Sequence, residues 1–419
     1  MNETESLETI DDQDFSEEIP KTEGSVIWHL MSQLRIGMSL SRITLPTFIL
    51  ETRSTIERFT DWMSHADILR KVQYERDPLI RCLHLCTWIV SGFHVAPRTP
   101  KKPYNSLLGE VYRAIVKDSN GKPFGTYIAE QVSHHPPISA FYYCDHEGSA
   151  VIWGHSEMKS KFLGNSVVAQ MDDCTKVNFE VPNLGESYEF NFPNMYGRGI
   201  IIGKLVMEIA GTVNIKCLKT GVTAKIEFLE KPLIFGRYNR FRGEIYDSNT
   251  SKKAQIVFDG RWSAFMRITD KRKDDPPYLS FDVRTQIPLK FDVPSFDELS
   301  MYESPRVWRE VSKYIKNNDM VHATDHKFAL EEKQRLERKY FDDNHIEWKS
   351  QSFYFSDELQ RYVPYNLNLN PSINKTENEP VTMPPPFKVP EAIQAAIDAG
   401  ASKTIDEIQE EVEEKIMGH

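Results

Sequence analysis

The chain has 419 residues, of which 40% are hydrophobic and 11% aromatic, enough apolar material to bury a sizeable core. Its net charge of −10 gives no support for nucleic-acid binding, which needs a basic face. The sequence contains neither an apolar run of the ~20 residues that a membrane-spanning helix needs nor the pattern of a secretory signal peptide.

The first predicted segment is an acidic tail over residues 1–23. Its first 20 residues hold eight acids and neither lysine nor arginine. Such a run of like charge is typically disordered, and anionic membrane surfaces repel it. The sequence leaves two interpretations open. Either the repulsion shortens the time that the protein stays on a membrane, or the tail is a solvated segment without a function.

An amphipathic helix is predicted within residues 24–44, because apolar residues recur there at helical intervals with few charges between them. Such a helix either packs on a core or serves as a lid over a cavity, since both roles need the same apolar face. The apolar positions are Ile27, Trp28, Leu30, Met31, Leu34 and Met38.

Residues 45–50 predict a short apolar strand or turn, and residues 55–95 alternate helical periodicity with polar breaks, as expected of two or three helices. Cys82, His84 and Cys86 have a spacing that could suggest a metal site, but their apolar neighbours indicate a buried helix instead. The five cysteines are irregularly spaced, which predicts no disulfides and a reducing, cytoplasmic compartment.

From about residue 112 to residue 283 the hydrophobic pattern has a period of two, interrupted by turn signals such as Ser119-Asn120-Gly121. Many short strands at regular spacing predict a large antiparallel sheet, and closure into a barrel would remove its edges. Helical periodicity returns over residues 304–341, beginning with Ser304-Pro305. An extended stretch (366–388) and two short helices (390–399 and 404–416) complete the prediction.

The motif His134-His135-Pro136-Pro137 is the most informative local feature. A residue before proline is extended, and proline cannot donate to a sheet ladder, so the motif predicts a strand end or edge that presents two imidazoles. The imidazoles could be a solvated turn, a metal site or an anion site. An anion with several oxygens, such as a phosphomonoester, suits two hydrogen-bond donors better than a metal does.

Two further clusters are ambiguous by themselves. Lys101-Lys102-Pro103-Tyr104-Asn105 places a cation and an amide three residues apart, which is usually a solvated loop. Lys327, Glu331 and Arg335 have the spacing i, i+4, i+8 along one face of a helix, which is usually a surface salt-bridge ladder.

The eight residues 130–137, EQVSHHPP, resemble the signature of the oxysterol-binding-protein-related family of lipid-transfer proteins. Residues 45–50 (LPTFIL), 101–105 (KKPYN) with Leu108-Gly109-Glu110, and the charged helix around Lys327 support the resemblance, which covers residues 24–365. It implies a mainly β (α+β) fold: a large, nearly closed antiparallel β-barrel around a lipid tunnel. An N-terminal helical lid (24–44), a helical segment before the barrel and C-terminal helices would flank it, with a lipid-binding domain over residues 45–365 and an extended wrap with short helices over 366–419.

The resemblance also implies a role for individual residues. The headgroup of phosphatidylinositol 4-phosphate would be bound by Lys102, Asn105, His134, His135, Lys327, Glu331 and Arg335. Phosphatidylserine and its acyl chains would contact Leu45, Thr47, Ile49, Lys102, Asn105 and Ser160. Ser106 stands where the family pattern has proline, which leaves this loop freer.

The implied function is the exchange of phosphatidylserine for phosphatidylinositol 4-phosphate between membranes, one lipid at a time. Sterol as the second lipid, or a lipid sensor without net transfer, are the alternatives. An enzyme is not expected, because neither a Gly-X-Ser-X-Gly elbow nor a Cys-X5-Arg loop is present. We expect no cofactor and no metal, a monomer with membrane lipids as its partners, and transient peripheral association at contacts between the endoplasmic reticulum and the plasma membrane.

Overall fold

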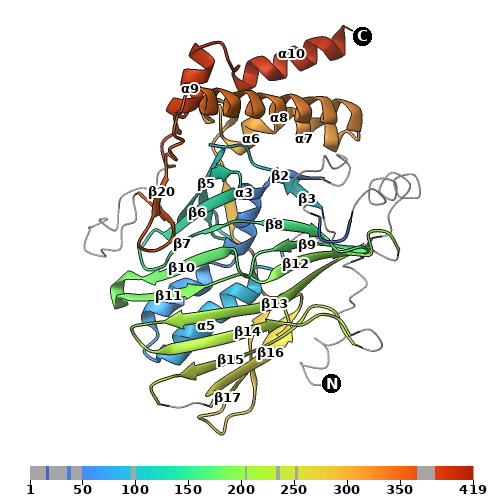
Figure 1. Ribbon diagram of the computed structural model, residues 1–419. Helices are drawn as coiled ribbons and strands as arrows, with labels where there is room; N and C mark the ends of the chain where they lie inside the picture. Colours follow the sequence, from blue (N-terminus) through green and yellow to red (C-terminus); the bar gives the residue numbers. More distant parts are fainter. Residues whose placement is uncertain are drawn as a thin grey trace.

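The computed structural model describes residues 16–17, 35–38, 50–95, 101–202, 205–232, 236–250, 253–365 and 383–418 (Figure 1). Its main element is one 17-stranded sheet. The strands are β1 (Ser16–Glu17), β4 (Val111–Lys117), β5 (Pro123–His134), β6 (Pro137–Asp145), β7 (Val151–Ser156), β8 (Lys159–Phe162), β9 (Ser166–Gln170), β10 (Thr175–Val181), β11 (Glu186–Phe190), β12 (Asn194–Arg198), β13 (Leu205–Cys217), β14 (Val222–Phe228), β15 (Arg240–Asp247), β16 (Ile256–Arg261), β17 (Phe265–Asp270), β18 (Tyr278–Asp282) and β19 (Lys290–Asp292).

Alternation of apolar and polar residues explains why these segments form strands. In β15, Phe241, Gly243 and Ile245 are buried, whereas the residues between them are exposed. Successive side chains of a strand point to opposite faces, so this pattern gives the sheet one dry and one solvated face. The predicted turns are also present: Gly121 and Gly148 both adopt positive φ between paired strands, which glycine does without steric cost.

The sheet is antiparallel and strongly curved, as predicted, but it is not closed. Antiparallel registers lead from β19 through β4, β5, β6, β7, β10, β11, β13, β14, β15, β16 and β17 to β18. Within the described residues no register joins β18 to β19. Helical residues cover this seam instead: the Leu289 amide donates to the Ser64 carbonyl (2.8 Å), and the hydroxyls of Thr87 and Ser280 lie 2.9 Å apart.

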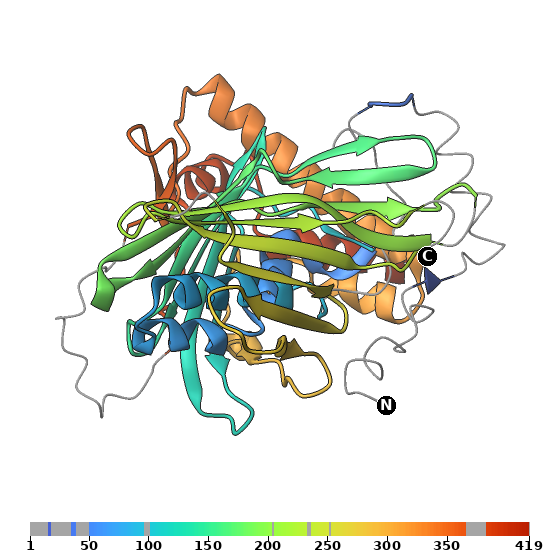
Figure 2. The same ribbon diagram turned by 90° about the horizontal axis from the view of Figure 1, so that it is seen from below.

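Figure 2 shows the sheet curving around the helices that precede it in the chain. These are α3 (Thr55–Arg58), η4 (Phe59–Met63), α4 (Asp67–Arg70), η5 (Lys71–Tyr74) and α5 (Pro78–Ser91). Helix α5 begins with Asp77 as N-cap and Pro78 in the first turn, residues that are favoured at these positions. Cys82 and Cys86 are free and fully buried on it, which confirms core packing rather than a metal site.

The long helix predicted over residues 304–341 is divided into three. They are α6 (Ser304–Val307), α7 (Arg309–Lys316) and α8 (Met320–Asp343). Trp308 departs from helical angles after α6, and Asn318, with φ of 58°, interrupts the chain before Asp319 caps α8. Helix α8 crosses one end of the sheet (Figure 1).

Two short helices follow as predicted, α9 (Glu391–Asp398) and α10 (Ile405–Met417), and α10 lies on the outer side of α7 and α8 (Figure 1). The smaller elements are the 3-10 helices η6 (Pro182–Leu184) and η7 (Phe296–Glu298), the parallel pair β2 (Leu50–Ser54) and β3 (Lys102–Tyr104), and a hairpin of β20 (Phe353–Ser356) and β21 (Arg361–Pro364) that the sequence did not predict.

The N-terminal predictions fall mostly outside the described residues. This holds for most of the acidic tail and for lid positions Ile27, Trp28, Leu30, Met31 and Leu34. Within the tail, β1 pairs antiparallel with β13. Met38, at the end of the predicted lid, is in a turn that pairs with β8: the Phe162 amide donates to the Met38 carbonyl at 3.0 Å.

Candidate functional site

The two histidines form a tight turn at the end of the sheet that α8 crosses. His134 ends β5 and pairs with Pro137, the first residue of β6, so His135-Pro136 is a two-residue connection. The prediction of a strand end is therefore confirmed. His135 is exposed, His134 is half-buried, and their ring centroids lie 4.6 Å apart.

The preceding residues of the motif shape this turn rather than line it. The buried carboxylate of Glu130 accepts hydrogen bonds from the backbone amides of Gln351 (3.1 Å) and Ser352 (2.9 Å). The Gln131 side chain accepts from the Ser139 hydroxyl at 2.6 Å and donates to the Ser133 carbonyl at 2.8 Å. Both side chains are thus used within the fold, and the two imidazoles are what the motif presents outward.

The electrostatics of His134 differ from the sequence-based expectation. The pKa of His134 is lowered to about 4, mainly by burial and also by the positive charge of Arg338, while a hydrogen bond with the Ser106 backbone acts in the opposite direction. With this pKa the imidazole is neutral near pH 7 in the unliganded protein, whereas an ordinary histidine titrates close to neutral pH. Its Nδ1 atom is buried and has no hydrogen-bond partner among the described residues.

The second component is the loop that begins with β3. Tyr104 anchors the loop: it is fully buried, stacks on Trp308 with centroids 4.5 Å apart, and its hydroxyl lies 2.9 Å from that of Ser312. On either side of this anchor, Lys102 is half-buried and Asn105 is exposed. The loop therefore has a fixed centre with a cation and an amide beside it.

Glu110 and Gly109 fasten the end of this loop to the histidine strand. The buried carboxylate of Glu110 accepts hydrogen bonds from the Leu107 amide (2.8 Å) and the Trp308 indole (3.0 Å). The Gly109 amide donates to the Gln131 carbonyl, and the Gln131 amide donates to the Glu110 carbonyl (3.0 and 2.9 Å). A side chain on Gly109 would collide with Trp348, and its φ of +78° also requires glycine.

The third component is α8. The Lys327 ammonium lies 2.5 Å from a Glu331 carboxylate oxygen, and only 12% of the Lys327 side chain is exposed. The pKa of Lys102 is lowered to about 8, mainly by burial and also by the charge of Lys327, while the charge of Glu331 acts in the opposite direction. Lys102, Lys327 and Glu331 therefore lie together, as the resemblance implied.

The predicted ladder ends at Glu331. Arg335 pairs with Glu332 (2.6 Å), not with Glu331, and its guanidinium lies 5.4 Å from the Phe328 ring. A helix turns 100° per residue, so each step of four residues drifts by about 40°, and Arg335 lies about 80° around α8 from Lys327. The salt-bridge ladder predicted from the i, i+4, i+8 spacing is therefore present between Lys327 and Glu331 but does not extend to Arg335, whose contact with the headgroup stays a prediction.

Arg338 belongs to the site but was missed from the sequence. It lies seven residues after Glu331, a spacing that returns to nearly the same face of the helix. Its charge acts on His134, and its only ion pair among the described residues is a long one, 3.8 Å to Asp342. The i, i+7 spacing was the signal that could have identified it.

The proposed acyl-chain contacts are only partly placed. Ser160 is half-buried on β8, opposite Ala169 of β9. Leu45, Thr47 and Ile49 lie outside the described residues.

The assembled cluster is suited to a polyanion with several oxygens. Lys102 and Lys327 lie beside the Glu331 carboxylate, and the charge of Arg338, on the same helix α8, acts on His134. Charge-assisted hydrogen bonds to such an anion are about twice as strong as neutral ones. The described residues contain no group of three or more metal-ligating side chains, and none of their helices is long and apolar enough to cross a membrane.

Comparison with known proteins agrees with this fold. Residues 29–373 match the family model described as "Oxysterol-binding protein". The chain is 36% identical over 345 residues to human oxysterol-binding protein-related protein 8, covering 81% of this chain but only 38% of that protein. It is 36% identical to the oxysterol-binding protein-like protein OBPa of Candida albicans (83% of this chain, 82% of that protein) and 37% identical to oxysterol-binding protein homolog 7 of Saccharomyces cerevisiae (78% and 75%).

Solved structures show the same fold at lower identity. The Osh1 ORD domain in complex with cholesterol has a TM-score of 0.67 at 22% identity, covering 82% of this chain and 86% of that one. The Osh3 ORD in complex with PI(4)P from Saccharomyces cerevisiae has a TM-score of 0.62 at 17% identity, covering 83% and 91%. The family consists of lipid-binding proteins rather than enzymes. The chain belongs to the oxysterol-binding protein family.

Proposed function

We propose that this protein extracts lipids one at a time and exchanges phosphatidylserine for phosphatidylinositol 4-phosphate between membranes. The observations that carry the proposal are the proximity of Lys102 to Lys327 and Glu331, and the proximity of Arg338, on the same helix, to His134. Three elements far apart in the sequence supply these groups. On an ordinary solvated surface, two lysines with no common ligand would stay apart, because proximity of Lys327 disfavours the charged form of Lys102.

The headgroup of phosphatidylinositol 4-phosphate matches the charges of the cluster. It carries a monoester phosphate, a diester phosphate and inositol hydroxyls. We assign the monoester to His134, His135 and Arg338, because the two imidazoles can donate and Arg338 has only a long ion pair of its own. We assign the diester phosphate to Lys102 and Lys327. We assign the inositol hydroxyls to Glu331 and Asn105. On binding, Arg335 would leave its partner Glu332 and pair with a phosphate of the lipid.

The second lipid follows from the same diester subsite. Phosphatidylserine has a diester phosphate, which Lys102 and Lys327 would bind, and a carboxylate, which Asn105 would bind. Leu45, Thr47, Ile49 and Ser160 are proposed to contact the glycerol and chains. Support for this choice comes from the sequence of residues 45–54, which resembles the phosphatidylserine-exchanging subgroup.

Sterol is the competing second lipid, because the Osh1 ORD domain, of the same fold, is known in complex with cholesterol and with ergosterol. A sensor that binds lipid without net transfer would use the same site. In each case we propose a cytoplasmic protein that visits membranes transiently, with contacts between the endoplasmic reticulum and the plasma membrane as the proposed location.

Transport between two liposome populations tests the proposal. Fluorescent reporters follow phosphatidylserine and sterol, with and without phosphatidylinositol 4-phosphate in the acceptor membranes. We expect phosphatidylserine transport that the phosphoinositide accelerates and that His134→Ala/His135→Ala abolishes. If the protein transports sterol instead, sterol is the second lipid. If it binds lipid but transports neither phosphatidylserine nor sterol, it is a sensor.

A further inference from the structure

We infer that helix α10 is a positioning element of the headgroup site: Ile405 and the polar face of α10 hold the Lys102 loop and α8 in the geometry that binds phosphate. The inference rests on the proposed function, since it concerns the same site. Helix α10 lies beyond residues 29–373, the part of the chain that the family model matches.

Ile405 connects the two elements that carry the lysines. It is fully buried in a small core whose members include Tyr104 of the lysine loop and Leu330 of α8. Tyr104 lies two residues after Lys102, and Leu330 immediately precedes Glu331. The remaining members are Leu50, Leu107, Val307, Trp308 and Val311, with Met301 and Ile315 at the edge.

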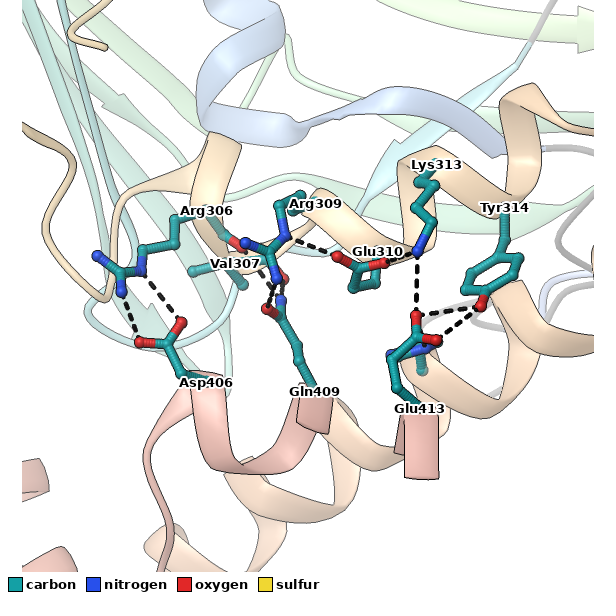
Figure 3. Close-up of polar contacts among 10 residues, drawn as sticks. Arg306, Val307, Arg309, Glu310, Lys313, Tyr314, Asp406, Gln409 and Glu413 are labelled. Atoms are coloured by element: carbon teal, nitrogen blue, oxygen red, sulfur yellow. Dashed lines mark hydrogen bonds and ion pairs between the residues drawn. The ribbon is translucent and has the colours of Figure 1, made fainter. Parts of the chain in front are cut away.

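A row of polar contacts fixes the orientation of α10 (Figure 3). Asp406 accepts two hydrogen bonds from Arg306 (3.1 and 2.6 Å). The Gln409 amide donates to the backbone carbonyls of Arg306 and Val307, each at 3.1 Å. These contacts hold the first turns of α10 against α6, directly beside Trp308, on which Tyr104 stacks.

The next turn of α10 makes equivalent contacts with α7 and α8. The Glu413 carboxylate accepts hydrogen bonds from the Tyr314 hydroxyl (3.0 Å) and the Lys313 ammonium (3.2 Å) (Figure 3). It also lies 3.4 Å from Nε2 of His326, which is buried on α8 next to Lys327. Asp406, Gln409 and Glu413 are spaced three and four residues apart, so one face of α10 carries all of these contacts.

The site needs such support because its cations repel one another when no ligand is bound. The charge of Lys327 contributes to the lowered pKa of Lys102, so the proximity of the lysine loop and α8 disfavours the charged form of Lys102. A scaffold that holds them together beforehand reduces the reorganisation that accompanies binding and so increases affinity.

The test compares two isoleucine truncations in the full-length chain. Ile405→Ala deletes the link, and Ile393→Ala is the matched control, because Ile393 is equally buried but belongs to a different cluster, in which α9 packs on Phe341 of α8. Affinity is measured with phosphatidylcholine vesicles containing phosphatidylinositol 4-phosphate. We expect Ile405→Ala to weaken binding by about fivefold or more, roughly 1 kcal/mol, and Ile393→Ala by less than about twofold.

Three further measurements separate positioning from a general loss of stability. Ile405→Val should restore the affinity for the vesicles. Asp406→Ala changes a partly exposed residue at the start of α10 and should also weaken binding, so it tests the inference if Ile405→Ala does not fold. Backbone hydrogen exchange of residues 104–107 should be faster in Ile405→Ala than in Ile393→Ala, with or without lipid. Equal affinity and equal exchange in the two truncations would overturn the inference. Wild-type protein that binds none of these vesicles would instead overturn the proposed function, and the exchange comparison would still test the positioning.

Discussion

Lys102 lies in the electric field of Lys327, although one residue is on β3 and the other is on α8, and its pKa is lowered to about 8 by burial and by that charge. The charge of Lys327 disfavours the charged form of Lys102, and the nearby Glu331 carboxylate offsets part of that effect. On the proposed function, a phosphate bound by the two lysines would offset the rest, so we expect the empty site to be less stable than the occupied one.

The first prediction separates binding from stability. Lys102→Met keeps the aliphatic stem and removes the charge, so it should weaken binding of phosphatidylinositol 4-phosphate by about 10- to 100-fold. It should also raise the free energy of unfolding at neutral pH by about 1 kcal/mol. Because the pKa of Lys102 is lower in the folded state than its ordinary value of 10.5, this gain should be largest below pH 8 and should fade as the pH approaches 10.5.

Urea unfolding and vesicle binding measure these two effects. Lys101→Met is the control, because Lys101 precedes Lys102 but is exposed. A Lys102→Met protein that is less stable than wild type would contradict the proposed repulsion.

The second prediction concerns Arg338. Since its charge lowers the pKa of His134, Arg338→Gln should raise that pKa and weaken phosphoinositide binding by about tenfold. Arg335→Gln should leave the His134 titration unchanged, because Arg335 pairs with Glu332. Nuclear magnetic resonance of the imidazole protons measures the titration. The opposite result, with Arg335→Gln shifting His134 and Arg338→Gln not, would remove Arg338 from the site.

The third prediction is proton uptake on binding. With a pKa of about 4, His134 is neutral in the free protein at neutral pH, and a bound dianion should raise that pKa. Affinity should therefore fall as the pH rises from about 6 to 8. Calorimetry in buffers of different ionisation enthalpy should show uptake of a fraction of a proton at the lower pH and less at the higher. A flat profile with no uptake would mean that the imidazoles bind phosphate as neutral donors.

The fourth prediction concerns a buried ion pair within α8. Lys333 and Glu337 form a salt bridge with the Lys333 side chain fully buried, and the Tyr302 and Ser402 hydroxyls bond to both. Glu337→Leu would leave Lys333 buried without its partner and should cost about 3–5 kcal/mol of unfolding free energy, whereas Lys333→Met/Glu337→Leu should recover most of it.

Chemical denaturation measures this loss. Glu411→Gln is the control, because it breaks the exposed Lys403–Glu411 pair and should change stability by less than about 1 kcal/mol. A double variant no more stable than Glu337→Leu would show that these hydroxyls, rather than the charges, dominate the network.

Local sequence patterns predicted most of the fold. The period-two alternation of β15 and the helix start at Ser304-Pro305 follow from side-chain direction and from the preference of proline for a first helical turn, which act over a few residues. The open seam between β18 and β19 could not be predicted, because helical residues such as Ser64 and Thr87 cover it from far away in the sequence. The β20–β21 hairpin was missed for a similar reason: Glu130, in another part of the chain, holds its start.

The candidate site, like the fold, was predicted from the sequence only in part. Sequence motifs singled out Lys102, His134 and Lys327 as candidate site residues. The charge state of a side chain depends on its burial in three dimensions, so the lowered pKa of His134 could not be predicted from the motif. The pairing of Arg335 with Glu332 reflects the drift of a helix face over eight residues, which the i, i+4, i+8 pattern ignores.

The most direct test of the central claim is extraction of phosphatidylinositol 4-phosphate from liposomes by the purified protein, measured as lipid recovered with the protein after the liposomes are removed. We predict about one lipid per protein for wild type and for Lys101→Met, and almost none for Lys327→Met or for His134→Ala/His135→Ala. Extraction that persists in both of these variants would contradict the account, because the headgroup would then be bound elsewhere.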